Sequence, residues 1–441
     1  METVIRQLAE GLVLRHARIE DSEALAAFNG EIHGRDNQIE RRSIGVWTED
    51  LISGRHPTFK SEDFLLVEDP KKKKIISSLN LISQVWTYAG IPFKVGRIEL
   101  VGTAPEYRRR GLVRNLFEEI HKMSQERGEL VQAITGIPYY YRQFGYEMAL
   151  GLQGGRLGYA SSVPELPAGK EEPYNIRPAV EKDLALISRL YDQAAENSLV
   201  SCQRTIEMWR YQLLGNSPDN IDRFELMIIL DPSGKAVGCL AHPAMLWPNA
   251  VTLVSYCISP EVSWWEVTPG VMRYLRARGI EYGKRAGREC AGIYFCLGEE
   301  HPVYKIFGHR LPRIIPPYAY YLRLPDLAAF VRLIAPVLEK RLAEVIQPGY
   351  SGELRLSFYR SGLALRFDRG VLADCRNLPP ADLNDVAAGF PGLTFLQILF
   401  GYHSLDQVRG AFPDCWVDED KCRPLLEALF PRQASNVWPI S

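Results

Sequence analysis

The clearest pattern of apolar and polar positions lies between residues 97 and 127. An apolar run at residues 98–101 predicts a buried strand, which Pro105 ends. After a basic turn, apolar side chains return at every third or fourth position: Leu112, Leu116, Phe117, Ile120 and Met123. That spacing predicts an amphipathic helix. The stretch therefore predicts a strand, a basic turn and a helix in succession.

Other segments of the first 150 residues follow the same two periods. Residues 21–33 have a helical pattern, and residues 64–68 and 75–84 alternate as paired strands around Asp69, Pro70 and Lys71. The four lysines at 71–74 then occupy a hairpin tip, where they are typical of a solvated loop. Residues 33–50 include His33 and Trp47, and we interpret them as a loop-rich region.

An internal repeat relates the first and second parts of the chain. Asp183 lies 162 positions after Asp21 (183 minus 21), and two further pairs keep almost the same separation. The matched segments are Leu14-Arg15-His16-Ala17 with Ile176-Arg177-Pro178-Ala179, Asp69-Pro70 with Asp231-Pro232, and Tyr141-x-x-Phe144-Gly145 with Tyr304-x-x-Phe307-Gly308. A match that keeps its phase over a whole domain indicates a duplicated fold.

After residue 325 the pattern changes. Residues 327–345 predict an amphipathic helix, residues 353–359 and 363–367 a hairpin, and residues 394–400 a short apolar helix. The chain thus divides into three α+β parts, 1–155, 174–325 and 326–441. A polar junction rich in proline and glycine at residues 151–173 separates the first two.

Composition narrows the class of protein. The 441 residues suffice for about three domains, and a formal net charge of −1 gives no global basic field for nucleic acid or an anionic membrane. No apolar stretch reaches about 18 residues, so we expect no membrane span and a cytoplasmic protein. The eight cysteines form no Cys-x-x-Cys pair and are expected to be buried thiols, and no metal site is predicted.

The basic turn carries the candidate chemistry. It consists of Arg108, Arg109, Arg110 and Gly111 at the start of the predicted helix. A helix start leaves backbone N–H groups unpaired at the positive end of the helix dipole, and a glycine lets the backbone approach a ligand closely. A phosphate group is therefore the expected guest. The corresponding place in the second part, residues 259–265, has no basic residue, and its Trp264 and Trp265 are expected in the core.

Two ordered motifs resemble those of GCN5-related N-acetyltransferases. Arg108-x-x-Gly111-x-Val113 is similar to their Arg/Gln-x-x-Gly-x-Gly/Ala acetyl-CoA motif, with Val113 where the family usually has a small residue. Residues 141–146, YRQFGY, match their closing Tyr-x-x-Phe-Gly-Phe/Tyr motif. Residues 395–401 and 424–431 resemble the end of sterol-carrier-like domains. This order of parts is similar, over nearly the whole chain, to the enhanced intracellular survival family of acetyltransferases.

The resemblance implies a fold and an activity. The fold would be two tandem GCN5-related N-acetyltransferase folds, each a mixed central sheet flanked by helices, followed by a sterol-carrier-like α+β domain. The first part would be catalytic and the second would lack the cofactor motif. The implied reaction moves the acetyl group of acetyl-CoA to a primary amine of a small molecule or peptide, without a metal. A homo-oligomer, in the family commonly a hexamer, is implied as well.

The same resemblance assigns residues. Acetyl-CoA would contact Val101, Gly102, Thr103, Arg108, Arg109, Arg110, Gly111, Leu112 and Val113. Tyr141 holds the family's tyrosine position and would protonate the leaving thiolate. The amine needs a base, because its pKa of about 10 keeps it protonated at neutral pH. Two candidates stay open: the α-carboxylate of Ser441, where the family usually ends in an aromatic residue, and Glu99, whose alternative role is an ion pair with Arg97.

A non-catalytic function is the alternative. The chain would then be an acyl-CoA-responsive or lipid-binding scaffold, with an apolar tunnel for a lipid or acyl chain in the C-terminal part. Aminoglycosides, small polyamines and protein lysines all remain open as acceptors.

Overall fold

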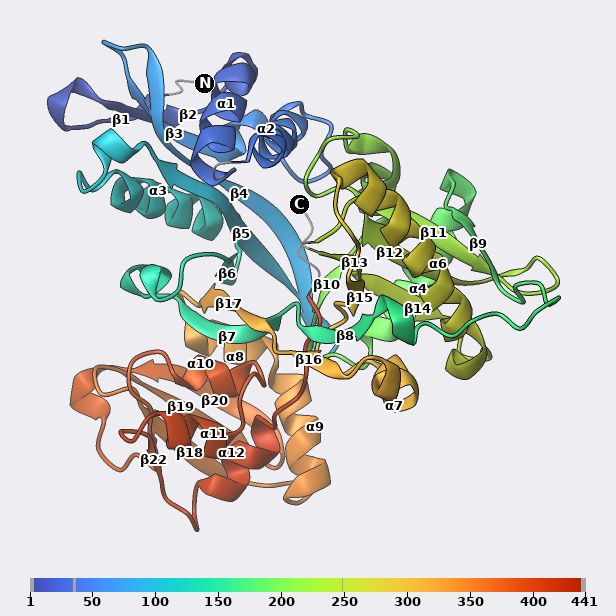
Figure 1. Ribbon diagram of the computed structural model, residues 1–441. Helices are drawn as coiled ribbons and strands as arrows, with labels where there is room; N and C mark the ends of the chain where they lie inside the picture. Colours follow the sequence, from blue (N-terminus) through green and yellow to red (C-terminus); the bar gives the residue numbers. More distant parts are fainter. Residues whose placement is uncertain (1–3, 35–36, 248, 438–441) are drawn as a thin grey trace.

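Two long antiparallel strands, β4 (Lys74–Tyr88) and β5 (Ile91–Thr103), form the centre of the molecule (Figure 1). The structure is a computed structural model that describes residues 4–34, 37–247 and 249–437. The two strands pair from Tyr88 opposite Ile91 to Ser77 opposite Thr103. Both are longer than the predicted strands at 75–84 and 98–101.

The strands β4 and β5 belong to the largest sheet, which defines the N-terminal unit. Its strand order is β1-β2-β3-β4-β5-β6-β17-β7, and β10 also pairs with β4. The remaining strands are β1 (Val4–Gln7), β2 (Val13–His16), β3 (Phe64–Asp69), β6 (Val131–Ile134), β7 (Glu147–Leu152), β10 (Val200–Gln203) and β17 (Tyr318–Arg323). The predicted hairpin of β3 and β4 is confirmed, with the lysines of residues 71–74 exposed at its tip.

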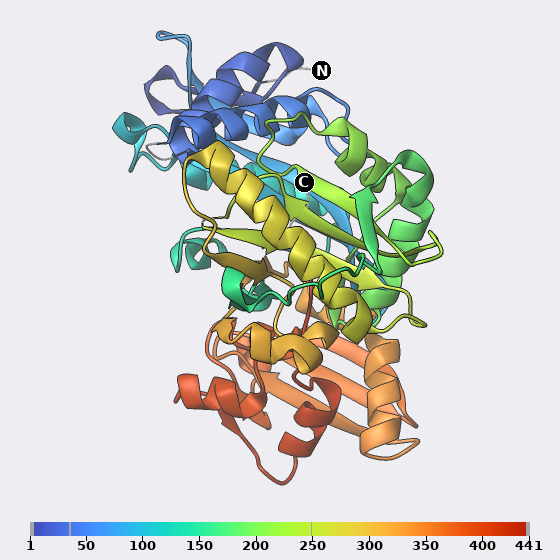
Figure 2. The same ribbon diagram turned by 45° about the vertical axis from the view of Figure 1, so that its right-hand side comes forward.

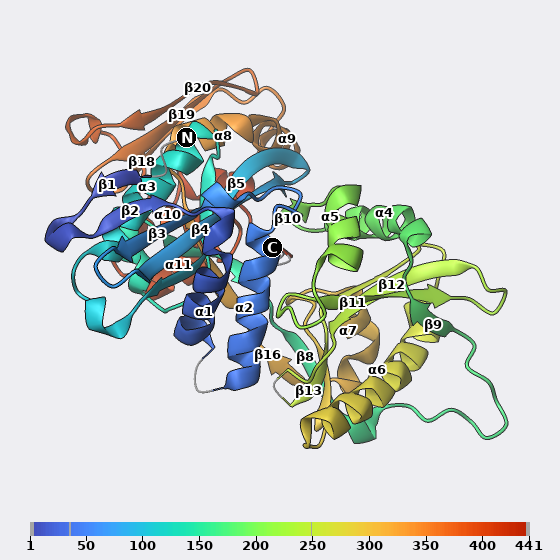
Figure 3. The ribbon, with the colours of Figure 1, turned by 90° about the horizontal axis from the view of Figure 1, so that it is seen from above.

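Helices cover both faces of this sheet (Figures 1 and 3). Helices α1 (Ser22–His33) and α2 (Gln38–Ile52) lie side by side on one face, and α3 (Leu112–Glu126) lies on the other. The helices predicted at residues 21–33 and after the basic turn are confirmed. The buried residues of α3 include the predicted Leu112, Leu116, Phe117 and Ile120.

The prediction of a loop-rich region at residues 33–50 was wrong, because α2 occupies most of it. The side chain of Asn37 accepts hydrogen bonds from the N–H groups of Ile39 and Glu40, which caps the start of the helix. Ile44, Trp47 and Leu51 form its buried stripe at helical spacing. Charged residues elsewhere on the helix masked that stripe in the sequence.

The middle unit contains two four-stranded sheets. One has the order β14-β12-β11-β9 and the other β13-β15-β8-β16. Their strands are β8 (Gly155–Tyr159), β9 (Asn175–Pro178), β11 (Phe224–Leu230), β12 (Ala236–Pro243), β13 (Ala250–Leu253), β14 (Ser255–Ile258), β15 (Gly292–Phe295) and β16 (Arg313–Ile315). Its helices are α4 (Leu184–Ala195), α5 (Ile206–Arg210), α6 (Trp264–Ala286), which crosses the front in Figure 2, and α7 (Pro302–Phe307).

Trp264 packs on Tyr256 as expected, whereas Trp265 is 63% exposed and is not a core residue.

The two units exchange strands. β17 follows the middle unit in sequence but lies between β6 and β7 of the N-terminal sheet, antiparallel to both. Conversely, β8 follows β7 directly and pairs with β15 and β16 of the middle unit. β8 starts at the expected boundary at residue 155, and β17 ends just before the one at residue 325. Each of these two strands belongs to the sheet of the opposite unit. Each sheet needs a strand from the other unit to be complete.

The repeated sequence motif makes the same contacts in both units. Arg15 of β2 pairs with Asp21, and Arg177 of β9 pairs with Asp183, each with an Nη1–Oδ2 distance of 2.7 Å. Each aspartate also accepts a hydrogen bond from the backbone N–H three residues earlier, at 2.8 Å and 2.9 Å. In both units the motif thus ties a strand to the start of the following helix.

A buried carboxylate joins α2 to the middle unit. Asp50 is 1% exposed and accepts hydrogen bonds from Ser217 (N–H 2.8 Å, hydroxyl 2.7 Å), Asn220 (2.7 Å) and Arg55 (2.7 Å). Replacing it leaves the amide of Asn220 buried without its acceptor.

We expect Asp50→Ala to lower the free energy of unfolding by about 3 kcal/mol, because several buried donors lose one shared acceptor. Chemical denaturation measures the change. Asp219→Ala is the matched control, since it breaks an exposed ion pair with Arg42 in the same region and should cost less than about 1 kcal/mol. Equal losses in the two variants would contradict an anchoring role for Asp50.

The C-terminal unit has a five-stranded sheet of order β20-β19-β18-β21-β22. Its strands are β18 (Gly352–Ser357), β19 (Gly362–Asp368), β20 (Val371–Leu378), β21 (Ala388–Gly389) and β22 (Trp416–Val417). Its helices are α8 (Leu327–Leu333), α9 (Ala335–Val345), α10 (Phe395–Leu399), α11 (Leu405–Ala411) and α12 (Arg423–Leu429). The predicted hairpin and short apolar helix are confirmed. The helix predicted at residues 327–345 is two helices, because Pro336 starts a new one after Ile334.

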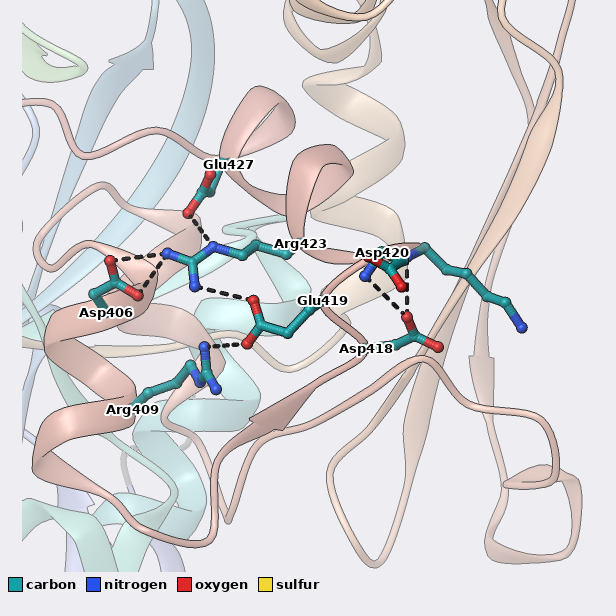
Figure 4. A network of polar contacts seen from close by, with 8 residues as sticks. Asp406, Arg409, Asp418, Glu419, Asp420, Arg423 and Glu427 are labelled. Carbon is teal, nitrogen blue, oxygen red and sulfur yellow. Dashed lines mark hydrogen bonds and ion pairs between the residues drawn. The ribbon is translucent and has the colours of Figure 1, made fainter.

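A network of exposed ion pairs joins α11, α12 and the loop between β22 and α12 (Figure 4). Arg423 contacts Asp406 at 2.8 Å, Glu419 at 3.1 Å and Glu427 at 2.9 Å, and Arg409 also contacts Glu419, at 2.7 Å. Arg423 thus pairs with carboxylates of α11, of the loop and of α12, and the network links these three segments.

Three further features bear on the expected class of protein. Seven of the eight cysteines are buried, Cys290 is half-buried, and all are free thiols, as the sequence predicted. Within residues 4–34, 37–247 and 249–437, no helix combines the length and apolar character needed to cross a membrane. The same residues contain no cluster of three or more histidine, cysteine, aspartate or glutamate side chains arranged to hold a metal ion.

Candidate active site

The central strand β5 has a β-bulge at Leu100. Glu99 lies opposite Asn80 and Gly102 lies opposite Ser78, so two residues of β5 face the single Leu79 of β4. Leu100 has a φ of 53°, a left-handed conformation that costs about 1–3 kcal/mol for a residue other than glycine. Such strain is common at functional sites. The bulge bends β5 just before the basic turn.

Beyond the bulge, β5 separates from β6. The two parallel strands pair only from Val95 opposite Val131 to Ile98 opposite Ile134. Over the described residues, the edge of β5 from Glu99 to Thr103 has no strand partner on that side. Its backbone N–H and C=O groups can therefore bind an extended ligand, and an N–H group there can stabilise an oxyanion.

The start of α3 is an open anion site. Gly111 adopts a left-handed conformation with a φ of 74°, and no side chain caps the helix. The first turn of the helix is closed by the N–H of Asn115, which bonds the carbonyl of Gly111 at 3.1 Å. A Cβ atom added at Gly111 would meet nothing within 4 Å. The unpaired N–H groups of this first turn therefore face open space, as a phosphate site requires.

The three arginines of the turn differ in whether their side chains already pair with a carboxylate. Arg110 pairs with Glu10 at 2.5 Å and stacks on Tyr107 at 4.8 Å. Arg108 donates to the carbonyl of Thr103 at 3.3 Å, and all three side chains are exposed. Among the described residues, Arg108 and Arg109 have no carboxylate partner. Their charges are thus available to an anionic ligand, whereas that of Arg110 is already neutralised.

Tyr141 lies in the 3-10 helix η5 (Tyr140–Phe144) and is 5% exposed. Its ring contacts Phe117 of α3 and Tyr321 of β17, with centroid distances of 6.0 Å and 5.4 Å. Burial raises the pKa of the Tyr141 hydroxyl, and the negative charge of Glu99 raises it further. The hydroxyl therefore keeps its proton at neutral pH. Tyr141 and Glu99, far apart in sequence, lie close enough to interact electrostatically.

The structure describes the surroundings of only one of the two candidate bases, Glu99. Glu99 is paired with Arg97, whose Nη2 and Nε atoms lie 2.5 Å and 3.0 Å from its Oε1 atom. The ion pair that the sequence offered as an alternative role is therefore present. Ser441 lies outside the described residues. Asn436, near the end of the described chain, forms a parallel bridge with Ser201 of β10, which itself pairs with β4.

Sequence reasoning missed Asn80 and Tyr320, two polar groups near Glu99. Asn80 of β4 and Tyr320 of β17 are both completely buried. His33, at the end of α1, has its Nε2 atom 3.3 Å from the place of a Cβ at Gly102, and burial lowers the pKa of its imidazole. A signal was available in β4: Ser78, Asn80 and Gln84 are polar side chains on one face of a strand that is largely buried.

Comparisons with known proteins agree with this geometry. Residues 20–149 match the family model described as "Acetyltransferase (GNAT) domain". A comparison with curated proteins gave no match. The matched residues 20–149 include the bulge of β5 and the start of α3.

Solved structures share the fold of this chain. A probable N-acyltransferase from Enterococcus faecalis has 15% identity and a TM-score of 0.62, covering 98% of this chain and 100% of that one. Eis1 from Mycobacterium abscessus has 12% identity and a TM-score of 0.57, covering 98% and 99%. N-myristoyltransferase from Saccharomyces cerevisiae, with bound myristoyl-CoA, has 12% identity and a TM-score of 0.51, covering 74% and 81%.

The fold and the site define a class of protein. Residues 20–149 match an acetyltransferase (GNAT) domain, and the similar structures show that the whole chain shares their fold.

Proposed function

We propose that the protein is an acetyl-CoA-dependent N-acetyltransferase that acts on a primary amine in the N-terminal unit. The observation that carries the proposal is the separation of β5 from β6 beside the uncapped start of α3. A strand edge with free backbone groups and an adjacent anion site together suit a ligand with an amide-containing arm and a pyrophosphate. Acetyl-CoA has both parts.

Each part of the site has a proposed role in binding or catalysis. The first turn of α3, Val113 included, with Arg108 and Arg109 would hold the pyrophosphate, and the edge of β5 at Val101, Gly102 and Thr103 would bind the arm. A backbone N–H of that edge would stabilise the oxyanion formed when the amine attacks the thioester carbonyl. Tyr141 would then give its proton to the departing thiolate. Its buried, protonated hydroxyl supports that role.

Several wider features belong to the same proposal. We infer that the N-terminal and middle units are duplicated acetyltransferase folds, since their repeated motifs make matching ion pairs. The middle unit would not bind acetyl-CoA, because α6 begins with Ser263 and Trp264 and has no basic turn before it. We also propose that the C-terminal unit is sterol-carrier-like, and that the protein is a cytoplasmic homo-oligomer, in the manner of the family it resembles.

The direct test measures thiol release. Purified protein is mixed with acetyl-CoA and a panel of primary amines, and free CoA is followed with a thiol reagent. Amine-dependent release is expected. Tight acetyl-CoA binding without release on any amine would instead support the alternative, a non-catalytic acyl-CoA-responsive or lipid-binding scaffold.

The two candidate bases are separated by a pair of variants. We expect Glu99→Gln to lower kcat less than tenfold, because Arg97 already neutralises the Glu99 carboxylate. Deleting residues 439–441 removes the native terminal carboxylate and should lower kcat by roughly 10². It should also move the pH optimum upward, towards the pKa of the amine. If Glu99→Gln instead lowers kcat by roughly 10² and raises the pH optimum, while the deletion has little effect, Glu99 is the base.

A further inference from the structure

Asn80 is a buried amide without a partner at the centre of the candidate site. It is 0% exposed, and neither its Nδ2 nor its Oδ1 atom has a hydrogen-bond partner among the described residues. Burying an amide in this way is costly, because it loses its hydrogen bonds to water and gains none in return. Asn80 lies directly opposite Glu99 across the β4–β5 ladder, so the two side chains share one face of the sheet.

Tyr320 is a second group of the same kind. It lies on β17, the strand that enters this sheet from beyond the middle unit, and it is 0% exposed. Its hydroxyl has no hydrogen-bond partner within the described part of the chain. The charges of Arg97 and Glu99 both act on that hydroxyl, and its ring packs against Trp86 at a centroid distance of 5.7 Å. Two buried groups from different strands thus flank one carboxylate.

The polar groups on either side of Asn80 along β4 have hydrogen-bond partners. Ser78, two residues before Asn80 on the same face, donates to Asn29 of α1 at 3.0 Å, and Asn29 donates to Thr48 of α2 at 3.2 Å. Trp86, further along β4, donates to Gln84 at 2.9 Å. The sheet face beneath α1 and α2 is therefore hydrogen-bonded on both sides of Asn80. Near Glu99, buried polar atoms without a partner among the described residues belong to Asn80, Tyr320 and His33, whose Nε2 atom is unpaired. Their grouping at one place points to a ligand that supplies the missing hydrogen bonds.

We propose that Asn80 and Tyr320 bind the acceptor, and that they select amines with a hydroxyl or carboxamide group close to the amino group. The inference rests on the proposed acetyl transfer. An amide and a phenol each donate and accept hydrogen bonds, as do the hydroxyl and carboxamide groups of such a ligand. Directly opposite residues of an antiparallel pair have Cβ atoms about 5 Å apart. An amino group lying next to Glu99 therefore has the neighbouring one or two carbons of the acceptor beside Asn80.

Plain alkyl amines fit this arrangement poorly. A polyamine or a lysine side chain presents only methylene groups next to its amino group. Those methylenes would leave the amide of Asn80 and the hydroxyl of Tyr320 buried and unpaired in the complex. Sites built to hydrogen-bond a substrate group discriminate strongly against analogues that lack it.

The test compares two amines that differ by one hydroxyl, cyclohexylamine and trans-2-aminocyclohexanol. Glycinamide tests the carboxamide, and 1,4-diaminobutane represents alkyl polyamines. In the wild type we expect kcat/KM for the amino alcohol or for glycinamide to exceed that for either alkyl amine by roughly 10- to 100-fold. The more active of the two identifies the group that the site recognises. Equal values for the amino alcohol and cyclohexylamine, with glycinamide no better, would overturn the proposal.

Asn80→Leu separates a binding role from a structural one. It should abolish the preference by lowering kcat/KM for the preferred amine while leaving cyclohexylamine nearly unchanged. It should also raise Tm, because it replaces an unpaired buried amide with an apolar side chain of similar size. Ser78→Ala is the control on the same strand face, and it should keep the preference, since the Ser78 hydroxyl is already bonded to Asn29. A retained preference or a lower Tm in Asn80→Leu would refute the inference.

A failure of the proposed function can be recognised separately. If no amine releases CoA from the wild type, acetyl transfer to these amines is refuted, and the site is then tested by binding alone. Calorimetry in the presence of CoA measures the affinity of the wild type and of Asn80→Leu for trans-2-aminocyclohexanol and glycinamide. A loss of affinity in the variant supports the site, and equal affinities for both ligands overturn it.

Discussion

A Gly111→Glu variant is expected to lose acetyl-CoA binding completely while the protein stays folded. The new carboxylate would lie at the uncapped start of α3, where it would occupy the anion site and repel a pyrophosphate. The added Cβ meets nothing within 4 Å, so the remaining cost is the left-handed backbone at a φ of 74°, about 1 kcal/mol. A negative charge at a helix start offsets part of that cost.

Calorimetry checks the expectation, with one acetyl-CoA bound per wild-type chain and none per variant chain. Gly128→Glu is the matched control, because Gly128 also has a left-handed φ, of 69°, and open space around it, but follows the opposite end of α3. It should bind acetyl-CoA normally. Undiminished binding in Gly111→Glu would move the cofactor site elsewhere, and a wild-type stoichiometry near two would give the middle unit a site of its own.

Local sequence patterns predicted the elements that carry the anion site. The strand, turn and helix between residues 97 and 127 could be predicted because each has a strong period and the turn contains a glycine that the backbone requires. The bulge at Leu100 could not be predicted. A leucine in the left-handed region has no local signature, since the conformation is imposed by the surrounding sheet.

The strand exchange was beyond sequence reasoning for a different reason. Nothing in the short sequences of β17 or β8 specifies the neighbouring strand. Pairing depends on contacts between residues far apart in the chain, which periodicity does not report. The same limit hid the proximity of Tyr320 to Glu99, because Tyr320 lies on the exchanged strand β17.

The second large effect is expected at Tyr141, the proposed acid. We expect Tyr141→Phe to lower kcat by roughly 10² or more, because the phenylalanine ring has no proton for the leaving thiolate. Affinity for acetyl-CoA should change little, since the first turn of α3 and the edge of β5 are untouched. Stability should also change little, because the ring contacts with Phe117 and Tyr321 remain. Steady-state CoA release and calorimetry measure the two effects.

The control is Tyr146→Phe in the same aromatic cluster. Tyr146 is buried, and its hydroxyl is hydrogen-bonded to His121 at 2.8 Å, so its loss should cost about 1 kcal/mol of stability. Turnover should stay near that of the wild type, because this hydroxyl already has a structural partner. If both variants lose activity equally, the loss reflects disturbed packing of the cluster and not a missing proton. If Tyr141→Phe keeps full activity, the thiolate is protonated by another group or by solvent, and the role of Tyr141 is confined to packing between α3 and β17.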